Sequence, residues 1–418
     1  MPTSPHRFLL LAATLLLGSI AVPAARADSP SKVRFATFNA SLNRGAEGAL
    51  VTDLSQPGNA QADAVAEIIQ RSRPDVVLVN EFDYVEGGRA LQLFQDNYLS
   101  KAHGDAKPIR YGYRYSAPSN TGLPSGFDLD NANGVVTQPG TRGYGEDSFG
   151  FGAYPGQFGM AVYSRYPIVR RQVRTFQKFL WKDMPGALLP DDPATPADDD
   201  FYSPDELAAF RLSSKSHWDL PLRVNGETVH FLVSHPTPPV FDGPEDRNGA
   251  RNYDEIRFWS DYVRPARSGY IYDDRGGEGG LEPRSRFVIA GDLNSDPSDG
   301  DSIPGAAQQL LENPRINASV TPTSPGAVEQ SAAQGLANLD QKGPPAQDTA
   351  DFDDRLPNGP GNLRVDYVLP SRYGLDPVDG FVFWPLSSDP RFAPVGTFPF
   401  PSSDHRLVAL DVRLDRRD

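Results

Sequence analysis

Short runs of apolar and β-branched residues recur along the whole chain, and they constrain its fold more than any other feature. The runs "DVVLV" (75–79) and "FVIAG" (287–291) are almost continuously apolar, which suits strands of a sheet covered on both faces. Amphipathic helical patterns at 59–73 and 253–263 separate such runs, and we find no repeat of solenoid or propeller length. We therefore predict a mixed α/β fold, with strands at 32–41, 75–82, 159–168, 217–224, 228–235, 286–294, 364–371 and 405–414.

The N-terminus has the pattern of a secretory signal peptide. Arg7 precedes the apolar run "FLLLAATLLLGSIAV", and "ARA" at 25–27 is a small-x-small cleavage site ending at Ala27. A membrane-spanning helix is the alternative, but the run is short of the roughly 20 apolar residues that a span needs. We predict removal of residues 1–27 and secretion to the extracellular space or the periplasm, with no transmembrane segment in the mature chain.

Residues 28–418 are predicted to form a single domain. The chain has no cysteine, so its stability depends on a hydrophobic core that a chain of this size can build without disulfides. Three stretches rich in Gly, Pro or acidic residues, at about 115–157, 185–205 and 321–362, are predicted to be long loop insertions. The formal net charge of −14 argues against a broad basic surface for binding polyanions.

The stretch "VIAGDLNSDPSDG" (288–300) resembles the start of a calcium-binding EF-hand loop because of its D-x-N-x-D spacing. Such a loop needs Gly at its sixth position and Glu at its twelfth, and Pro297 and Ile303 occupy them here. A strand-like run precedes Asp292, so we expect Asp292 and Asn294 to lie at the carboxyl end of a strand, where α/β proteins commonly build sites. Asp296 and Asp299 are expected only to shape the following turn.

Other polar residues also interrupt or end apolar strands. They are Asn39, Glu81, His235, Asp366 and the pair Asp404–His405. Each one taken alone fits a strand-end cap or a buried polar residue with a partner. Together with Asp292 and Asn294, they could hold a hard cation and surround it with acid–base groups.

In these motifs the chain resembles the endonuclease/exonuclease/phosphatase superfamily, which has the deoxyribonuclease-I-like fold. The resemblance implies an α/β fold, a four-layer α/β/β/α sandwich of two mixed β-sheets flanked by helices, with the site at one edge of the sheets. It also implies cleavage of a phosphoester bond with Mg²⁺, or with Mn²⁺ or Ca²⁺. The matching elements follow the family's order: "ATFNAS", "RPDVVLVNEFD", "GMAVYSRYPI", "VSHPTPP", "VIAGDLNSDP", "LRVDYVLP" and "SSDHRLVALDV".

The resemblance also implies a role for each matching residue. Glu81 would be the principal metal ligand, with Asn39 and Asp404 close to the ion. Asp292 would orient or deprotonate the attacking water, and Asn294 would bind a phosphate oxygen. His405 would stabilise charge or act as a base, and Asp366 would fix its tautomer. His235 would contact the phosphate and protonate the leaving oxygen.

Three further residues are weaker candidates for substrate binding. Arg165 in "YSRYPI" fits a family position near the site only loosely. Lys215 and His217 in "SSKSHWD" are two residues apart, which would place them on one face of a strand. They could contact a phosphate there, but a strand face turned to solvent is the favoured interpretation.

Three functions remain open at this stage. A secreted phosphoester hydrolase acting as a monomer on a small or lipid-like phosphate compound is favoured by the acidic charge. An extracellular nuclease of the same mechanism is the first alternative, since an acidic protein can still carry a locally basic groove. A non-catalytic binding module on the same fold is the second, and the presence of every expected polar residue argues against it.

Overall fold

The structure is a computed structural model that describes residues 1–2, 32–132, 134–355 and 359–415. The predicted signal peptide lies outside the described residues, apart from its first two positions. In the part of the chain that is described, no helix is both long and apolar enough to cross a bilayer.

Two mixed β-sheets form the centre of the molecule. The first has the strand order β12-β13-β1-β2-β4-β3, and the second has the order β11-β8-β7-β6-β5. Within each sheet one neighbouring pair is parallel, β1 with β2 and β7 with β8, and the other neighbours are antiparallel. The strands are β1 (Lys32–Asn39), β2 (Val76–Asn80), β3 (Tyr113–Tyr115), β4 (Met160–Ser164), β5 (Arg174–Thr175), β6 (Trp218–Val224), β7 (Glu227–Val233), β8 (Arg286–Asp292), β11 (Asp366–Pro370), β12 (Leu375–Val382) and β13 (Val408–Leu414).

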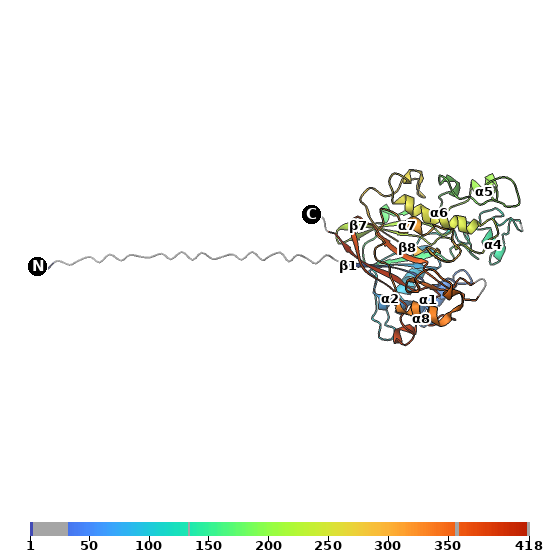
Figure 1. The fold of residues 1–418 in the computed structure, drawn as a ribbon. Coiled ribbons are helices and arrows are strands. Elements are labelled where there is room, and N and C mark those ends of the chain that lie inside the picture. The colour runs from blue at the N-terminus through green and yellow to red at the C-terminus, as the bar shows by residue number, and fades with distance from the viewer. Residues whose placement is uncertain (3–31, 133, 356–358, 416–418) are drawn as a thin grey trace.

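Helices cover the outer faces of the two sheets. Figure 1 shows α6 and α7 on one side of the strands and α1, α2 and α8 on the other, which completes the predicted four-layer sandwich. The helices are α1 (Ala49–Leu54), α2 (Ala60–Ser72), α3 (Arg89–Phe94), α4 (Arg142–Glu146), α5 (Pro204–Leu207), α6 (Arg247–Tyr262), α7 (Gln308–Leu311) and α8 (Pro325–Gln334).

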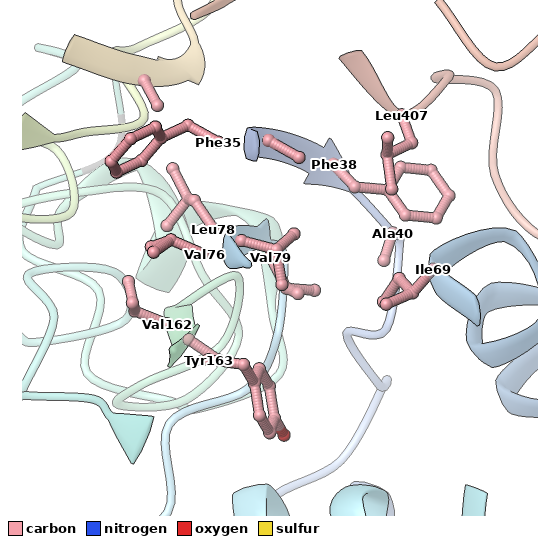
Figure 2. Packing of buried hydrophobic residues seen from close by; sticks show 14 of the residues in the cluster. Phe35, Phe38, Ala40, Ile69, Val76, Leu78, Val79, Val162, Tyr163 and Leu407 are labelled. Carbon is pink, nitrogen blue, oxygen red and sulfur yellow. The ribbon is translucent and has the colours of Figure 1, made fainter. Parts of the chain in front are cut away.

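The alternation of side chains along β8 explains why its sequence is apolar at nearly every position. Val288 and Ala290 belong to the core cluster that joins the two sheets, in which the rings of Phe35 on β1 and Phe231 on β7 lie 5.7 Å apart. Phe287 and Ile289 point the other way, into the cluster formed with α6. Figure 2 shows part of the first cluster, with residues from β1, β2 and α2. A strand that is buried on both faces has no solvent-facing positions, so polar residues do not alternate with apolar ones along it.

The predicted strands and helices are confirmed, although the ends of several of them differ by a few residues. The helix predicted at 253–263 begins earlier, at Arg247, and the strand predicted at 217–224 begins at Trp218. Edge strand β12 was not predicted, because its sequence "LDPVDGFV" contains Pro377 and Gly380. Both residues are tolerated in an edge strand, and the register of β12 also shows a bulge between Pro377 and Asp379.

The prediction that 321–362 is a loop throughout is wrong. It contains α8 and the small antiparallel pair β9 (Ala350–Asp351) and β10 (Asn362–Leu363). Ser324 caps α8 by accepting from the backbone N–H of Ala327. The segment also carries Thr349, whose hydroxyl donates to Asp366 at 2.8 Å. The segment thus supports the candidate site described next.

Candidate active site

The strand topology brings the predicted polar residues to one edge of both sheets. Asn39 ends β1 opposite Asn80 at the end of the parallel strand β2, and Glu81 follows directly. Asp292 ends β8 opposite Asp366, which begins the antiparallel strand β11. The ends of parallel strands and the starts of their antiparallel neighbours meet at the same edge, so side chains from distant positions in the sequence come together there.

A cleft of about 1000 Å³ opens at this edge. Six of the predicted residues line it, namely Glu81, His235, Asp292, Asn294, Asp404 and His405. Asn39 and Asp366 are buried behind them and support them through hydrogen bonds. Eight of the ten predicted site residues are therefore in one place.

Asp292 is the centre of the cluster. Its Oδ2 lies 3.4 Å from Nε2 of His235 and 3.6 Å from Nε2 of His405, and it accepts from Nδ2 of Asn39 at 3.0 Å. Burial raises the pKa of Asp292 to about 6, with a smaller contribution from the Asp366 carboxylate, while His405 opposes the rise. The carboxylate is thus ionised at neutral pH and more basic than an ordinary aspartate.

His405 is held by a carboxylate on the side away from Asp292. Its Nδ1 lies 2.9 Å from Oδ2 of Asp366, so Nδ1 carries the hydrogen and Nε2 faces Asp292. Burial alone lowers the pKa of His405, but the charges of Asp366 and Asp292 and the Asp366 hydrogen bond outweigh it and raise the pKa to about 10. His405 is therefore an imidazolium at neutral pH.

His235 has the opposite character. Burial lowers its pKa well below the ordinary histidine value, and the nearby positive charges of Lys215 and His405 lower it further. Among the described residues its Nδ1 has no hydrogen-bond partner. The site therefore holds one charged and one neutral imidazole, and burial together with neighbouring charge separates their protonation states.

Glu81 follows β2 with a left-handed backbone, at a φ of 55°. Its Oε1 accepts from Nδ2 of Asn39 at 3.1 Å and its Oε2 from Nδ2 of Asn43 at 2.8 Å. Enclosure by the protein raises the pKa of Glu81, and the hydrogen bond from Asn39 opposes the rise. Within the described part of the chain neither Glu81 nor Asp404 forms an ion pair at 4.0 Å or less.

Asn294 and the two turn aspartates occupy the loop after β8. Asn294 donates from Nδ2 to the carbonyl of Pro236 at 3.1 Å. Asp296 accepts backbone N–H groups from Ser298 and Asp299, and Asp299 accepts from the backbone of Lys342. The prediction that Asp296 and Asp299 shape the loop is confirmed, and the strand that ends at Asp292 leaves no EF-hand helix before it.

The placement of Arg165 contradicts a role in substrate binding. Arg165 follows β4, which runs antiparallel to β2, so Ser164 lies opposite Val76 at the far end of the sheet from Glu81. The Arg165 guanidinium lies 3.0 Å from the carboxylate of Asp75. The local motif could not show this, because the direction of β4 in the sheet is set by pairing with a distant strand.

His217 is also wrongly predicted to contact substrate. It is completely buried, with Nδ1 2.5 Å from Oγ of Ser213 and Nε2 2.9 Å from the carbonyl of Glu255. Its ring packs against Phe258 and Trp259 of α6. Burial lowers the pKa of His217 to about 4, so it is a neutral residue of the core.

Sequence reasoning undervalued Lys215 and missed Asn43 and Thr349. Lys215 and His217 do not share a strand face, because β6 begins only at Trp218, and Lys215 lines the cleft. The lysine beside a histidine in "SSKSHWD" was a usable signal, whereas nothing local distinguishes Asn43 or Thr349 from ordinary loop residues.

Comparison with known proteins agrees with this geometry. The model of the Endonuclease/Exonuclease/phosphatase family matches residues 36–405. No curated protein matches the chain.

Several solved structures are similar to the chain at low identity. An endonuclease/exonuclease/phosphatase from Beutenbergia cavernae is 18% identical with a TM-score of 0.46, and the match covers 92% of this chain and 72% of that one. Sphingomyelinase C from Streptomyces griseocarneus is 15% identical with a TM-score of 0.44, covering 91% and 99%. TDP2 from Caenorhabditis elegans is 14% identical with a TM-score of 0.42, covering 92% and 74%.

Proposed function

Because the chain belongs to the endonuclease/exonuclease/phosphatase family, we propose that it is a divalent-metal-dependent hydrolase of phosphoester bonds. The observation that carries this proposal is the position of Asp292 between His235 and His405, with all three residues lining one cleft. Hydrolysis of a phosphoester needs a base for water and groups that offset charge on the phosphoryl oxygens. Asp292, His235 and His405 offer both kinds of group.

In this proposal Asp292 orients the attacking water and takes its proton. The His405 imidazolium, kept charged by Asp366, offsets the negative charge that grows on the phosphoryl oxygens. His235 offers a neutral N–H to the phosphate or to the leaving oxygen, and Asn294 offers an amide. A positioned network of this kind does most of its work through fixed charge rather than covalent chemistry.

The donor set fits a hard divalent cation such as Mg²⁺. The carboxylates of Glu81 and Asp404 lack ion-pair partners among the described residues, and such oxygen ligands suit Mg²⁺, Mn²⁺ or Ca²⁺. Glu81 would be the main ligand, with Asp404 beside it. Asn39 now presents its N–H to Glu81 and Asp292, so as a ligand its amide would turn over. When bound, the ion supplies positive charge that polarises the phosphoester.

A second group consists of two carboxylates and one imidazole, those of Asp292, Asp366 and His405, whose ligand atoms lie within 4.8 Å of one another. His405 already shares a hydrogen bond with Asp366, so these residues are committed to each other. Glu81 and Asp404 line the same cleft without an ion-pair partner among the described residues, which supports the metal set implied by the family resemblance.

The lining of the cleft favours a small or lipid-like phosphoester over nucleic acid. Phe151 and Phe241 line it with 51% and 74% of their surface exposed, which suits an apolar leaving group. Besides Asp292 and Asp404, four further aspartates line it: Asp296, Asp299, Asp301 and Asp353. They would repel the long phosphate backbone of a polynucleotide.

The arginines of the cleft are already engaged. Arg142 and Arg247 pair with Glu146, and Arg247 also pairs with Glu245. Arg251 is buried and donates to backbone carbonyls, among them that of Leu212 at 2.8 Å. A basic groove for a polyanion would need cations without partners of this kind.

We also propose that residues 28–418 act as one exported domain after cleavage near Ala27, and as a monomer. Mass spectrometry of the protein recovered from the culture medium or periplasm would find the N-terminus at Asp28. Light scattering of the purified protein would give the mass of one chain.

A substrate panel tests the proposed activity. The mature protein with Mg²⁺, Mn²⁺ or Ca²⁺ is assayed on plasmid DNA, bis-p-nitrophenyl phosphate, p-nitrophenyl phosphate and phospholipids, with EDTA as the control. We expect cleavage of a small or lipid-like ester and loss of turnover in Asp292→Ala and His405→Ala. Asp376→Asn, at a partly exposed carboxylate on the edge strand β12, is the matched control. Plasmid nicking would favour the nuclease, and no cleavage at all would favour a binding module.

A further inference from the structure

Lys215 is a buried cation in the wall of the cleft. It is only 6% exposed, and it lines the same cavity as Glu81 and His235. Its Nζ makes a single long hydrogen bond, 3.5 Å to the carbonyl of Pro236, and no carboxylate lies within 4.0 Å of it in the described residues. An ammonium group has three donors, and burying it without a partner is costly. The free protein therefore leaves most of the donor capacity of Lys215 unused at the wall of the cleft, where an anion could accept from it.

The ammonium group lies beside residues proposed to handle the phosphate. The carbonyl of Pro236 accepts from both Nζ of Lys215 and Nδ2 of Asn294, so these two donors are neighbours. The charge of Lys215 also acts on the rest of the site, since it lowers the pKa of His235 and of Glu81. Burial lowers the pKa of Lys215 itself, while the negative charges of Glu255, Glu81 and Asp292 raise it.

The loop that carries Lys215 is fixed by Glu255 of α6. One carboxylate oxygen of Glu255 accepts from the backbone N–H of Ser214 at 2.7 Å and from its hydroxyl at 3.2 Å. The other oxygen accepts from the backbone N–H of Thr237 at 2.6 Å. Glu255 thus connects the loop of Lys215 to the loop that follows His235, which sets the spacing of the two side chains.

The insertion at 115–157 holds the same loop from the opposite direction. The backbone N–H of Asn120 donates to the carbonyl of Lys215 at 2.8 Å, and Gly150 packs so closely on the Ser214 carbonyl that a Cβ there would lie 1.9 Å from it. The backbone of Lys215 is therefore held in place before any substrate arrives. A preorganised charge of this kind needs little rearrangement during the reaction.

We propose that Lys215 is a further catalytic residue, which donates to a non-bridging oxygen of the bound phosphoryl group and offsets the charge of its transition state. This inference rests on the proposed function and deepens it. In the reaction the water oxygen forms a bond to phosphorus while the bond to the leaving oxygen breaks. Asp292 receives the proton of the water, and Lys215 keeps its own protons throughout. A compact ammonium group suits this role as a point charge.

The test compares Lys215→Met and Lys215→Arg with the wild-type protein and with Lys178→Met, which removes an exposed lysine outside the cleft. For Lys215→Met we expect kcat/KM to fall about 100-fold, within the range for losing one preorganised donor. Lys215→Arg keeps the charge and should lose less. The Tm of Lys215→Met should be unchanged or higher, because an unpaired buried charge is replaced by an apolar side chain.

A binding measurement separates this inference from the proposed function. Titration of the metal-free protein with inorganic phosphate, followed by calorimetry, should show weaker binding by Lys215→Met than by wild type. If wild type cleaves substrate but Lys215→Met stays within twofold of it, Lys215 is not catalytic. A lower Tm with unaltered phosphate affinity would show a structural role and overturn the inference. If wild type cleaves no substrate, the proposed function fails, and the difference in phosphate affinity still decides whether Lys215 contacts phosphate.

Discussion

Replacing Asp366 with asparagine tests the reasoning about the charged histidine most directly. Asp366 accepts from Nδ1 of His405 at 2.9 Å and from the hydroxyl of Thr349 at 2.8 Å, and it is buried. Asparagine keeps the shape and one acceptor oxygen but removes the charge that keeps His405 protonated. The prediction is a protein of normal fold in which His405 loses its proton at much lower pH.

The magnitude follows from the hydrogen bond that loses its charge. A hydrogen bond to a charged group contributes about 1.5–3 kcal/mol. If that contribution is lost from the transition state, kcat/KM falls by about 10- to 150-fold. The pKa of His405, about 10 in the wild type, should also fall well below that value, because burial then acts with less opposition.

The pH dependence of stability gives an independent measurement. An ordinary histidine has a pKa of 6.5, whereas His405 keeps its proton up to a pKa of about 10 in the folded protein. Its contribution to the free energy of unfolding is complete below pH 6.5 and is lost as pH rises to about 10. In Asp366→Asn this decline should be much smaller.

The assays are steady-state kinetics, NMR titration of the His405 ring in the metal-free protein, and denaturant unfolding at several pH values. Asp376→Asn controls for the loss of a carboxylate elsewhere. If Asp366→Asn retains kcat/KM within twofold of wild type, or if the His405 pKa stays near 10, the charge of Asp366 does not do what the geometry indicates.

Three other predictions follow from the same structure. Glu255→Gln places an N–H donor against backbone N–H groups. Both Tm and kcat should therefore fall, with a loss of about 1–3 kcal/mol in the free energy of unfolding. Unchanged values of both would contradict the positioning role of Glu255. Burial and the charges of Asp296 and Asp299 raise the pKa of Asp348 to about 8. The free energy of unfolding should therefore fall as pH rises from 4 to 8. Asp348→Asn should raise Tm more at pH 8 than at pH 4 in calorimetry. Glu81→Gln should increase the Mg²⁺ concentration needed for half-maximal turnover by about tenfold or more, and an unaltered Mg²⁺ titration would remove Glu81 from the metal ligands.

Local sequence patterns predicted a mixed α/β fold, and the family resemblance implied its four layers and the residues of the site. Continuous apolar runs identified β2 and β8 because both faces of these strands are covered. Polar residues at strand ends stood out against those runs, and the ordered motifs assigned Glu81, Asp292 and His405 to one cleft. Strand burial and strand ends could be predicted in this way because both depend on neighbouring residues in the sequence.

The tertiary structure alone decided two matters that the local pattern left open. It placed Arg165 at the far end of its sheet, since an antiparallel partner sets the direction of β4. It also separated Lys215 from His217, which lie two residues apart in a loop and not on a strand. His217 packs into the core against α6, whereas Lys215 remains in the cleft without an ion-pair partner among the described residues.

The sequence by itself determined which residues can carry the chemistry and at the ends of which strands they lie. Only the tertiary structure decided their protonation and their partners, because burial and neighbouring charges come from segments far apart in the chain. Asp366, which accepts a hydrogen bond from Thr349, and Asp292 raise the pKa of His405. Glu255 on α6 fixes the loop of Lys215. Each of these contacts joins residues that no short sequence window contains.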